Sequence, residues 1–316
     1  MFEDLLFSLG IVMPLFVMLT VGFGLKKVNL INENFAAGGN KLMFYIGLPV
    51  IVFRSIYRAD IGEIFDPLFV GGMLVITLVT GGLIWLAATP TIKDKPVRGA
   101  FVLSAFRGNQ AFLGIPLLIN LAGDAGAIRA TMVVTFILPF ANILSIFLLA
   151  STCNPDRKLS PKEIFLTIIK NPMVIVTALG LGMAFIGLRL PGLAVSTIDS
   201  ISDMATPLAL LCLGASMRFQ GFDVKFKYAV MASLIKVVAL PMVFGLTAYV
   251  LGFRGYDLAA ILLMGGVPSA IAGYAMVVEM GGDGYVAGTI VVISTVLSAF
   301  TLTLFIYGIR VLGIVG

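Results

Sequence analysis

The chain has 316 residues, of which 59% are hydrophobic and 12% are charged, whereas a soluble domain usually carries about 25% charged residues. Its formal net charge of +5 is too small and too scattered to indicate nucleic-acid binding. There is no histidine, and Cys153 and Cys212 stand alone, which excludes a histidine-based triad, a metal cluster and a disulfide framework. The composition therefore predicts an all-α membrane protein.

Ten apolar runs, each about twenty residues long and able to cross a bilayer, take up nearly the whole chain. In chain order they cover residues 5–25, 35–56, 68–88, 97–121, 127–150, 164–188, 195–217, 228–251, 258–280 and 285–312. We expect each run to form a transmembrane helix. Glu3 and Asp4 precede the first run where a signal peptide would carry basic residues, so this run is expected to be retained.

The basic residues between the runs are unevenly divided between the two sides of the membrane. One side receives thirteen: Lys26, Lys27, Lys41, Lys93, Lys95, Arg98, Arg157, Lys158, Lys162, Lys170, Arg218, Lys225 and Lys227. The other side receives six: Arg54, Arg58, Arg129, Arg189, Arg254 and Arg310. By the positive-inside rule the first side is cytoplasmic. We therefore expect both termini outside the cytoplasm and a cytoplasmic linker at residues 151–163.

The two halves of the chain, residues 1–150 and 164–316, share a spacing of prolines and glycines. Matching residues lie 158 or 159 positions apart: Pro14 and Pro172, Gly22 and Gly180, Pro49 and Pro207, Gly114 and Gly273, and Gly123-Asp124 and Gly282-Asp283. A nearly constant offset indicates an internal repeat. Because each half has five runs, the second copy is expected to be inverted in the membrane, as in many secondary transporters.

The fourth and ninth runs each contain a stretch that is unsuited to an ordinary helix. Residues 107–116 read Arg-Gly-Asn-Gln-Ala-Phe-Leu-Gly-Ile-Pro, and residues 265–274 read Gly-Gly-Val-Pro-Ser-Ala-Ile-Ala-Gly-Tyr. Prolines, glycines and a cation weaken a spanning helix, and non-helical backbone at membrane depth is tolerated where it is buried in protein or lines a cavity. The repeat offset pairs Asn109 with Pro268, so we expect two broken helices that cross at the bilayer centre.

Such a crossing would present the N–H groups and positive dipole ends of two half-helices to an anion. The candidate binding residues come from the two stretches: Asn109, Gln110, Gly114, Pro116, Pro268 and Ser269. Pro116 and Pro268 are expected in the first turn of a restarting half-helix. For either stretch alone, the alternative is a proline kink packed by neighbouring helices.

Two cations, Arg107 and Lys236, fall inside apolar runs, where a charge costs at least about 2.5 kcal/mol. Each is a candidate counter-ion for an anionic substrate. Alternatively, Arg107 neutralises the negative end of the first half-helix, and Lys236 extends its ammonium group toward a helix end. Glu279 and Asp203 are candidates to carry a coupling proton, and the alternative for both is a solvated acid at the membrane surface.

Catalytic and nucleotide-binding motifs are missing from the sequence. We find no G-x-S-x-G, no Walker loop, and no G-x-G-x-x-G after a strand. The chain is therefore predicted to be neither an enzyme nor an ATP-driven pump, and to need no cofactor. Coupling of transport to H⁺ and coupling to Na⁺ both remain open.

Residues 109–116, Asn-Gln-Ala-Phe-Leu-Gly-Ile-Pro, resemble the Asn-Thr-x-x-x-Gly-Ile-Pro run of the auxin efflux carrier family, which holds the plant PIN carriers and many bacterial permeases. Pro268, the ten apolar runs and the central linker extend the resemblance over the full chain. Gln110 stands where the family commonly has threonine, and the linker is too short for a PIN-type regulatory domain. Auxin is therefore not the expected substrate.

The resemblance implies a fold shared with bile-acid sodium symporters and sodium/proton antiporters. It implies a scaffold domain built from predicted helices 1, 2, 6 and 7 and a transport domain built from helices 3–5 and 8–10. Elevator-like movement and a homodimer joined through the scaffold helices are implied as well. In the family, the asparagine and proline of the crossing bind the substrate carboxylate, and these positions correspond to Asn109 and Pro268.

The sequence thus predicts a secondary carrier for a small organic anion in a bacterial inner membrane. One alternative is a sodium-coupled symporter of the bile-acid type, which would need a cluster of acidic and amide side chains near the crossing. Another is a channel or a membrane interaction protein, which would lack a transport cycle.

Overall fold

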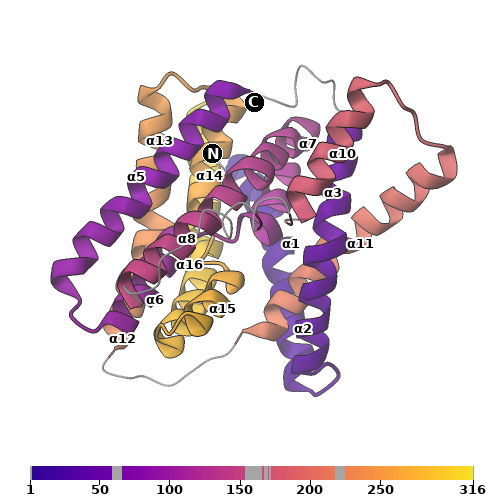
Figure 1. Cartoon of the computed structure of the whole chain (residues 1–316). Helices are drawn as coiled ribbons and strands as arrows, with labels where there is room; N and C mark the ends of the chain where they lie inside the picture. The colour runs from indigo at the N-terminus through magenta and orange to yellow at the C-terminus, as the bar shows by residue number, and fades with distance from the viewer. Residues whose placement is uncertain are drawn as a thin grey trace.

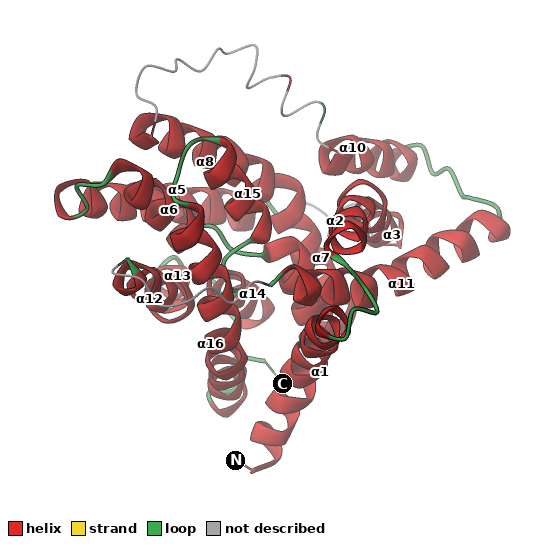
Figure 2. Cartoon of the chain, turned by 90° about the horizontal axis from the view of Figure 1, so that it is seen from below, coloured by secondary structure: helices red, strands yellow, loops and turns green. Residues whose placement is uncertain are grey.

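The computed structural model describes residues 2–58, 66–153, 166, 170, 172–217 and 225–315. Throughout these residues the regular structure is helical, as Figure 2 shows. An isolated antiparallel β-bridge between Gly108 and Ser269 is the one extended pairing in this part of the chain. The predicted all-helical class is confirmed for the described residues.

Figure 1 labels the helices along the chain. The α-helices are α1 (Phe2–Lys27), α2 (Glu33–Leu42), α3 (Leu48–Arg58), α5 (Pro67–Thr91), α6 (Lys95–Phe106), α7 (Ile115–Met132), α8 (Leu138–Cys153), α10 (Pro172–Phe185), α11 (Gly192–Ser216), α12 (Phe226–Leu234), α13 (Leu240–Val250), α14 (Gly255–Gly266), α15 (Ile271–Glu279) and α16 (Gly284–Val311). Four π-helical segments precede some of them: η1 (Met43–Gly47), η2 (Gln110–Gly114), η3 (Val133–Ile137) and η4 (Ile235–Ala239).

Each π-helical segment runs into an α-helix whose second residue is proline. These prolines are Pro49, Pro116, Pro139 and Pro241. A proline lacks the N–H group that an α-helix needs, and its ring collides with the carbonyl group four residues earlier. The wider π-helical turn gives that carbonyl more room. The chain can therefore continue as a helix through positions where proline would otherwise end it.

The helices form two groups that Figures 1 and 2 show side by side. In the first group, α11 packs against α1, α2 and α3, and α10 packs against α3. In the second group, α5 and α8 pack against α6, α13 packs against α14, and α12 packs against α16. Contacts between α1 and α16 join the two groups. Helix α7 joins them as well, because it packs against α3 of the first group and α14 of the second.

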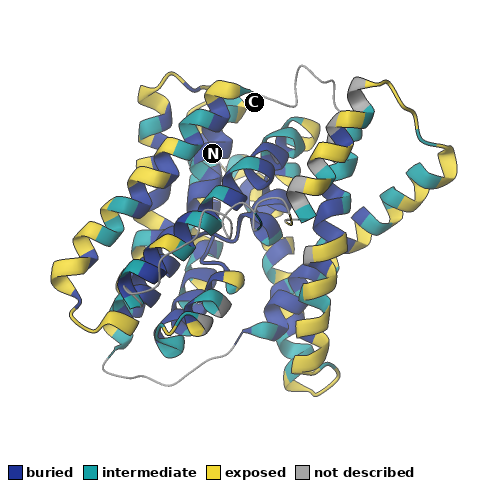
Figure 3. Cartoon of the chain, viewed as in Figure 1, coloured by how far each residue is buried: buried dark blue, intermediate teal, exposed yellow. Residues whose placement is uncertain are grey.

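Buried residues gather where the helices meet, and the outer faces carry exposed apolar side chains (Figure 3). Exposed examples from both groups are Leu83, Leu193, Leu246, Val250 and Phe300. Large apolar surfaces of this kind mark contact with a partner or a membrane. The burial pattern therefore fits a protein whose outer faces contact lipid.

Seven stretches of the described residues are long and apolar enough to cross a membrane, whereas the sequence predicts ten. They are Phe2–Lys27, Glu33–Arg54, Pro67–Thr91, Gln110–Cys153, Gly192–Ser216, Phe226–Val250 and Gly284–Val311. One of them, Gln110–Cys153, is kinked at Gly123, where φ is 54° and ψ is −129°. The ninth predicted run appears as two short helices, α14 and α15. The sixth run falls partly outside the described residues, so the count of ten stays a prediction.

Two glycines bring α1 and α11 into close contact. A Cβ atom on Gly22 would collide with the backbone oxygen of Leu211, and one on Gly214 would collide with that of Leu19. We expect Gly22→Leu to lower the free energy of unfolding by about 1–3 kcal/mol because the helices must separate. Gly24→Leu is the matched control, because a Cβ on Gly24 meets nothing within 4 Å. Equal melting temperatures for the two variants would contradict this packing.

Candidate functional site

The two stretches that the sequence singles out are both interrupted, and they lie against each other. Helix α6 ends at Phe106 and helix α14 ends at Gly266. Beyond these ends, the Asn109 N–H donates to the carbonyl oxygen of Pro268 at 2.7 Å, and the Ala270 N–H donates to that of Arg107 at 3.2 Å. Two backbone hydrogen bonds therefore tie one break to the other.

Beyond each break the chain returns to a helix. The first stretch resumes as η2 at Gln110 and continues into α7, so that Pro116 lies in the first turn of that α-helix. The second stretch resumes as α15 at Ile271. Pro268 lies in the break itself and not in the first turn of α15, unlike the expectation from sequence. Proline has no N–H group to donate, but the hydrogen bond to Asn109 needs only the carbonyl oxygen of Pro268. A proline at this position therefore loses no hydrogen bond between the two breaks.

The polar side chains of the crossing are enclosed by protein. Asn109, Gln110 and Ser269 are all buried. The N–H of Ser269 donates to the hydroxyl group of Ser294 on α16 at 3.0 Å. Gly114 allows a close approach of α14, because a Cβ atom there would lie 2.6 Å from the Sδ atom of Met264.

Arg107 and Lys236 are buried beside the crossing, with 5% and 1% of their surfaces exposed. The Nη1 atom of Arg107 donates to the Ser145 hydroxyl on α8 at 3.2 Å. The Nζ atom of Lys236 donates to the carbonyl oxygen of Gly265 at 2.6 Å. Lys236 therefore points into the protein and contacts the end of α14 instead of extending to the membrane surface.

The two acidic candidates lie away from the crossing in the chain. Asp203 has an exposed side chain that forms an ion pair with Arg54 at 2.7 Å, which fits the alternative of a solvated acid. Glu279 is the last residue of α15, and its side chain lies outside what the structure describes.

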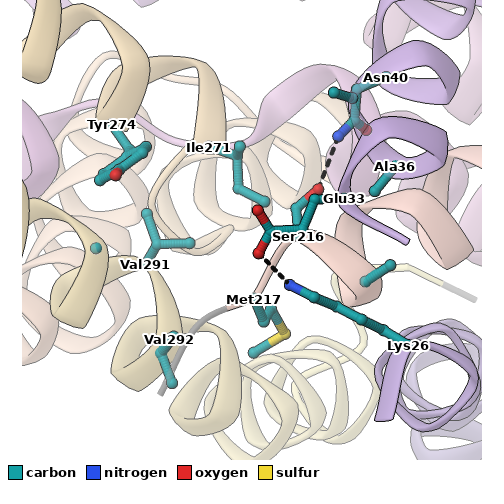
Figure 4. Close-up of a pocket in the computed structure, with 13 residues that line it drawn as sticks. Lys26, Glu33, Ala36, Asn40, Ser216, Met217, Ile271, Tyr274, Val291 and Val292 are labelled. Carbon is teal, nitrogen blue, oxygen red and sulfur yellow. Dashed lines mark hydrogen bonds and ion pairs between the residues drawn. The ribbon is translucent and has the colours of Figure 1, made fainter. Parts of the chain in front are cut away.

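A cavity of about 280 Å³ lies between the first helix group and the helices α15 and α16 (Figure 4). Its lining residues are Lys26, Glu33, Ala36, Ala37, Asn40, Ala215, Ser216, Met217, Ile271, Tyr274, Gly288, Val291 and Val292. We call this space the main cavity. Ile271, the first residue of α15, lies in its wall, so the cavity reaches the half-helix that restarts after the second break.

Most polar side chains of the main cavity come from the first helix group, and Tyr274 on α15 adds a phenol group. Lys26 and Glu33 form an ion pair at 3.2 Å, and the Asn40 side-chain amide donates to the Ser216 hydroxyl at 2.9 Å (Figure 4). The sequence interpretation did not include these residues as candidates. Asn40, an amide within a predicted apolar run, was the available signal. None of the candidates Asn109, Gln110 or Ser269 lies in the wall of the main cavity.

A much smaller cavity of about 10 Å³ lies between the first helix group and the other restarted half-helix. Its wall contains Ala111, Phe112, Ile115 and Pro116 from η2 and α7, and residues of η1, α3 and α11. Each restarted half-helix therefore faces the first helix group across a space, one wide and one nearly closed.

The chain resembles proteins named as transporters. The profile of a family described as "Membrane transport protein" matches residues 7–165 and 154–306. An "Uncharacterized transporter" of Methanothermobacter thermautotrophicus is 25% identical over 295 residues, covering 93% of this chain and 95% of the relative. The "Uncharacterized transporter YfdV" of Escherichia coli K12 is 24% identical and covers 85% and 87%. A "Putative malonate transporter" of Rhizobium meliloti is 22% identical and covers 95% of both chains.

Proposed function

Since the chain belongs to the family of membrane transport proteins, whose profile matches most of its length, we propose that it is a secondary-active carrier for a small organic anion. The family and the named relatives make it an integral membrane transporter and not an enzyme. The name of the Rhizobium meliloti relative includes malonate, which makes a small dicarboxylate the first substrate to test.

One observation carries the proposal: the main cavity connects a lysine side chain with the start of a half-helix. Lys26 supplies the cation, which is paired with Glu33 in the same wall and would have to exchange that partner for the anion, and Ile271 begins α15 there. The N-terminus of a helix carries a partial positive charge and free N–H groups. Asn40 and Ser216 add hydrogen-bonding groups, and the remaining wall is mostly apolar. This chemistry suits a carboxylate with a short carbon skeleton.

The ion pairs support the proposed ten-span inverted repeat. Lys225 pairs with Asp283 at 2.7 Å, and both residues fall in segments assigned to the cytoplasmic side. Arg129 pairs with Asp257 at 2.8 Å, and both fall on the opposite side. Pairing between residues assigned to opposite sides would contradict the assignment.

The positions of the two termini support the same topology. Arg310, near the end of α16, lies 3.8 Å from Asp4 in the first turn of α1, and Figure 1 shows the two ends of the chain close together. Both ends on one side require an even number of crossings, and the ten predicted spans meet this requirement. We place these ends outside the cytoplasm of a bacterial inner membrane, following the positive charges.

We propose an elevator-type cycle in which the second helix group, with both broken helices, moves past the first helix group. The first group corresponds to the scaffold expected from predicted helices 1, 2, 6 and 7, and it would also form the homodimer contact. The main cavity reaches Lys26, on the side assigned to the cytoplasm, whereas the cavity beside Pro116 is nearly closed. The arrangement therefore corresponds to a cytoplasm-facing state.

A thermal-shift experiment on the purified protein tests the substrate class. We expect malonate to raise the melting temperature, because a ligand at 100 times its dissociation constant stabilises a folded protein by about 2.7 kcal/mol. Malonamide is the control, because it has nearly the same shape without the charges. Equal shifts with both compounds, or no shift with any of a panel of carboxylates, would contradict an organic anion as the substrate.

A further inference from the structure

The carbonyl groups at the end of α14 have lost their helical partners. The N–H group that Gly265 would bind in a continuous helix belongs to Ser269, and it donates instead to the Ser294 hydroxyl. The next carbonyl, of Gly266, would bind the N–H of Ala270, which donates to Arg107. Such a broken helix end has a partial negative charge. In secondary transporters, carbonyl groups of this kind coordinate the coupling ion.

A lysine side chain occupies this helix end. Lys236 reaches from η4, and its Nζ atom donates to the carbonyl oxygen of Gly265 at 2.6 Å. A Cβ atom placed on Gly108 would lie 3.2 Å from the same Nζ atom. The amino group therefore lies against both broken stretches, at the crossing itself. With 1% of its surface exposed, Lys236 is shielded from solvent.

The first broken helix has a matching cation. The Ala105 carbonyl near the end of α6 would bind the N–H of Asn109 in a continuous helix, but that N–H donates to Pro268. Arg107 follows directly after α6 and is buried. Each of the two helices that end at the crossing therefore has a buried basic residue at its end. Arg107 directly follows α6, and the side chain of Lys236 contacts the end of α14.

The described residues that line the space beside Lys236 offer oxygen atoms, and none of them is acidic. A space of about 10 Å³ beside Lys236 and Arg107 is also lined by Thr77, Thr80 and Gln110. The part of the chain that the structure describes holds no group of three or more acidic, cysteine or histidine side chains that could bind a metal ion. A mobile Na⁺ at this position would therefore compete with Lys236 for the same carbonyl and be repelled by two buried cations.

We propose that Lys236 takes the place of a coupling Na⁺ at the end of α14, so that the carrier binds its anion and completes its cycle without sodium. This inference rests on the proposed carrier function and excludes the sodium-coupled alternative. It also gives Arg107 and Lys236 a role in holding the crossing together. The positively charged groups that remain to bind the anion in the main cavity are then Lys26 and the start of α15.

Two variants of one residue test the assignment. Lys236→Met removes the charge but fills the space, whereas Lys236→Ala removes the charge and leaves room for an ion beside the carbonyl oxygen of Gly265. We expect both variants to melt below the wild type in choline chloride. In sodium chloride, only Lys236→Ala should recover, with a melting temperature that rises by a few degrees for each tenfold increase in Na⁺.

The wild-type protein provides the second measurement, which does not depend on the folding of a variant. Its melting temperature and its dissociation constant for malonate should be the same in sodium chloride and in choline chloride. Tenfold tighter binding in sodium chloride would overturn the proposal. A folded Lys236→Ala variant that responds to Na⁺ no more than Lys236→Met does would also overturn it.

The melting curves in sodium and choline chloride separate this inference from the proposed function. If no carboxylate binds but Lys236→Ala gains a response to Na⁺, the substrate class is wrong and the assignment of Lys236 stands. If malonate binds and Lys236→Ala gains no response, the carrier function stands and the assignment of Lys236 is wrong.

Discussion

Replacing Asn109 by alanine is expected to lower transport by roughly 10- to 100-fold while the protein remains folded. Asn109 lies directly before η2 and is buried at the crossing, where its backbone binds Pro268. Alanine keeps this backbone hydrogen bond and removes only the amide group. Asn109 does not line the main cavity, so the effect requires that the anion reaches the crossing during the transport cycle. Loss of one hydrogen bond to a charged ligand there costs about 1.5–3 kcal/mol, which weakens binding by roughly 10- to 100-fold. Uptake of labelled malonate into proteoliposomes measures the loss.

Asn120→Ala is the matched control for this substitution. Asn120 lies on α7, the helix that follows the same break, and its amide donates to the carbonyl oxygen of Ile11 at 3.4 Å. Its removal takes away an amide of equal size at a distance from the crossing. We expect near-normal uptake by Asn120→Ala. Normal uptake by a folded Asn109→Ala variant would refute the role of Asn109.

Filling the main cavity is expected to lower transport as well. Ala37 on α2 is exposed and lies in the cavity wall, so a tryptophan at this position would project into the space. When the substrate is also present, the indole ring and the substrate would overpack the same space, which costs about 1–3 kcal/mol. A substrate that needs the same space would bind about 10- to 100-fold more weakly. We expect Ala37→Trp to lower malonate uptake accordingly and to leave the melting temperature of the unliganded protein nearly unchanged.

The neighbouring residue gives the control for Ala37→Trp. Gly38 lies one position further along the same helix, outside the cavity wall, and a Cβ atom there meets nothing within 4 Å. Gly38→Trp adds the same large side chain to the same helix without entering the cavity. Equal uptake by the two tryptophan variants would show that the main cavity is not part of the transport path.

The sequence was informative wherever a residue type is rare at membrane depth. The glycines, amides and prolines in residues 107–116 and 265–274 predicted two interruptions, and the structure shows both. They are visible in sequence because proline and glycine affect the backbone directly, without reference to distant residues. The division of the loops between two sides follows from the alternation of the apolar runs, and the ion pairs join residues assigned to the same side. Which side is cytoplasmic stays a prediction from the basic residues.

Features that depend on packing could not be predicted in the same way. The main cavity is formed by α1, α2, α11, α15 and α16, which come from distant parts of the sequence. The hydrogen-bond acceptor of Lys236 is a backbone carbonyl, and every residue has one, so the side chains give no signal of the pairing. The ninth predicted span is not a single helix, because the half-helices α14 and α15 are each shorter than a membrane crossing.

The hydrogen bonds between Asn109 and Pro268 and between Arg107 and Ala270 have a consequence for how relatives diverge. Both bonds use main-chain atoms, which substitutions elsewhere do not remove. Residues that face the transported molecule can therefore change during evolution while the junction of the two broken helices is retained. Gly108 is the exception, because a Cβ atom there would lie 2.7 Å from Val267. A new selectivity could arise in this architecture without rebuilding its centre.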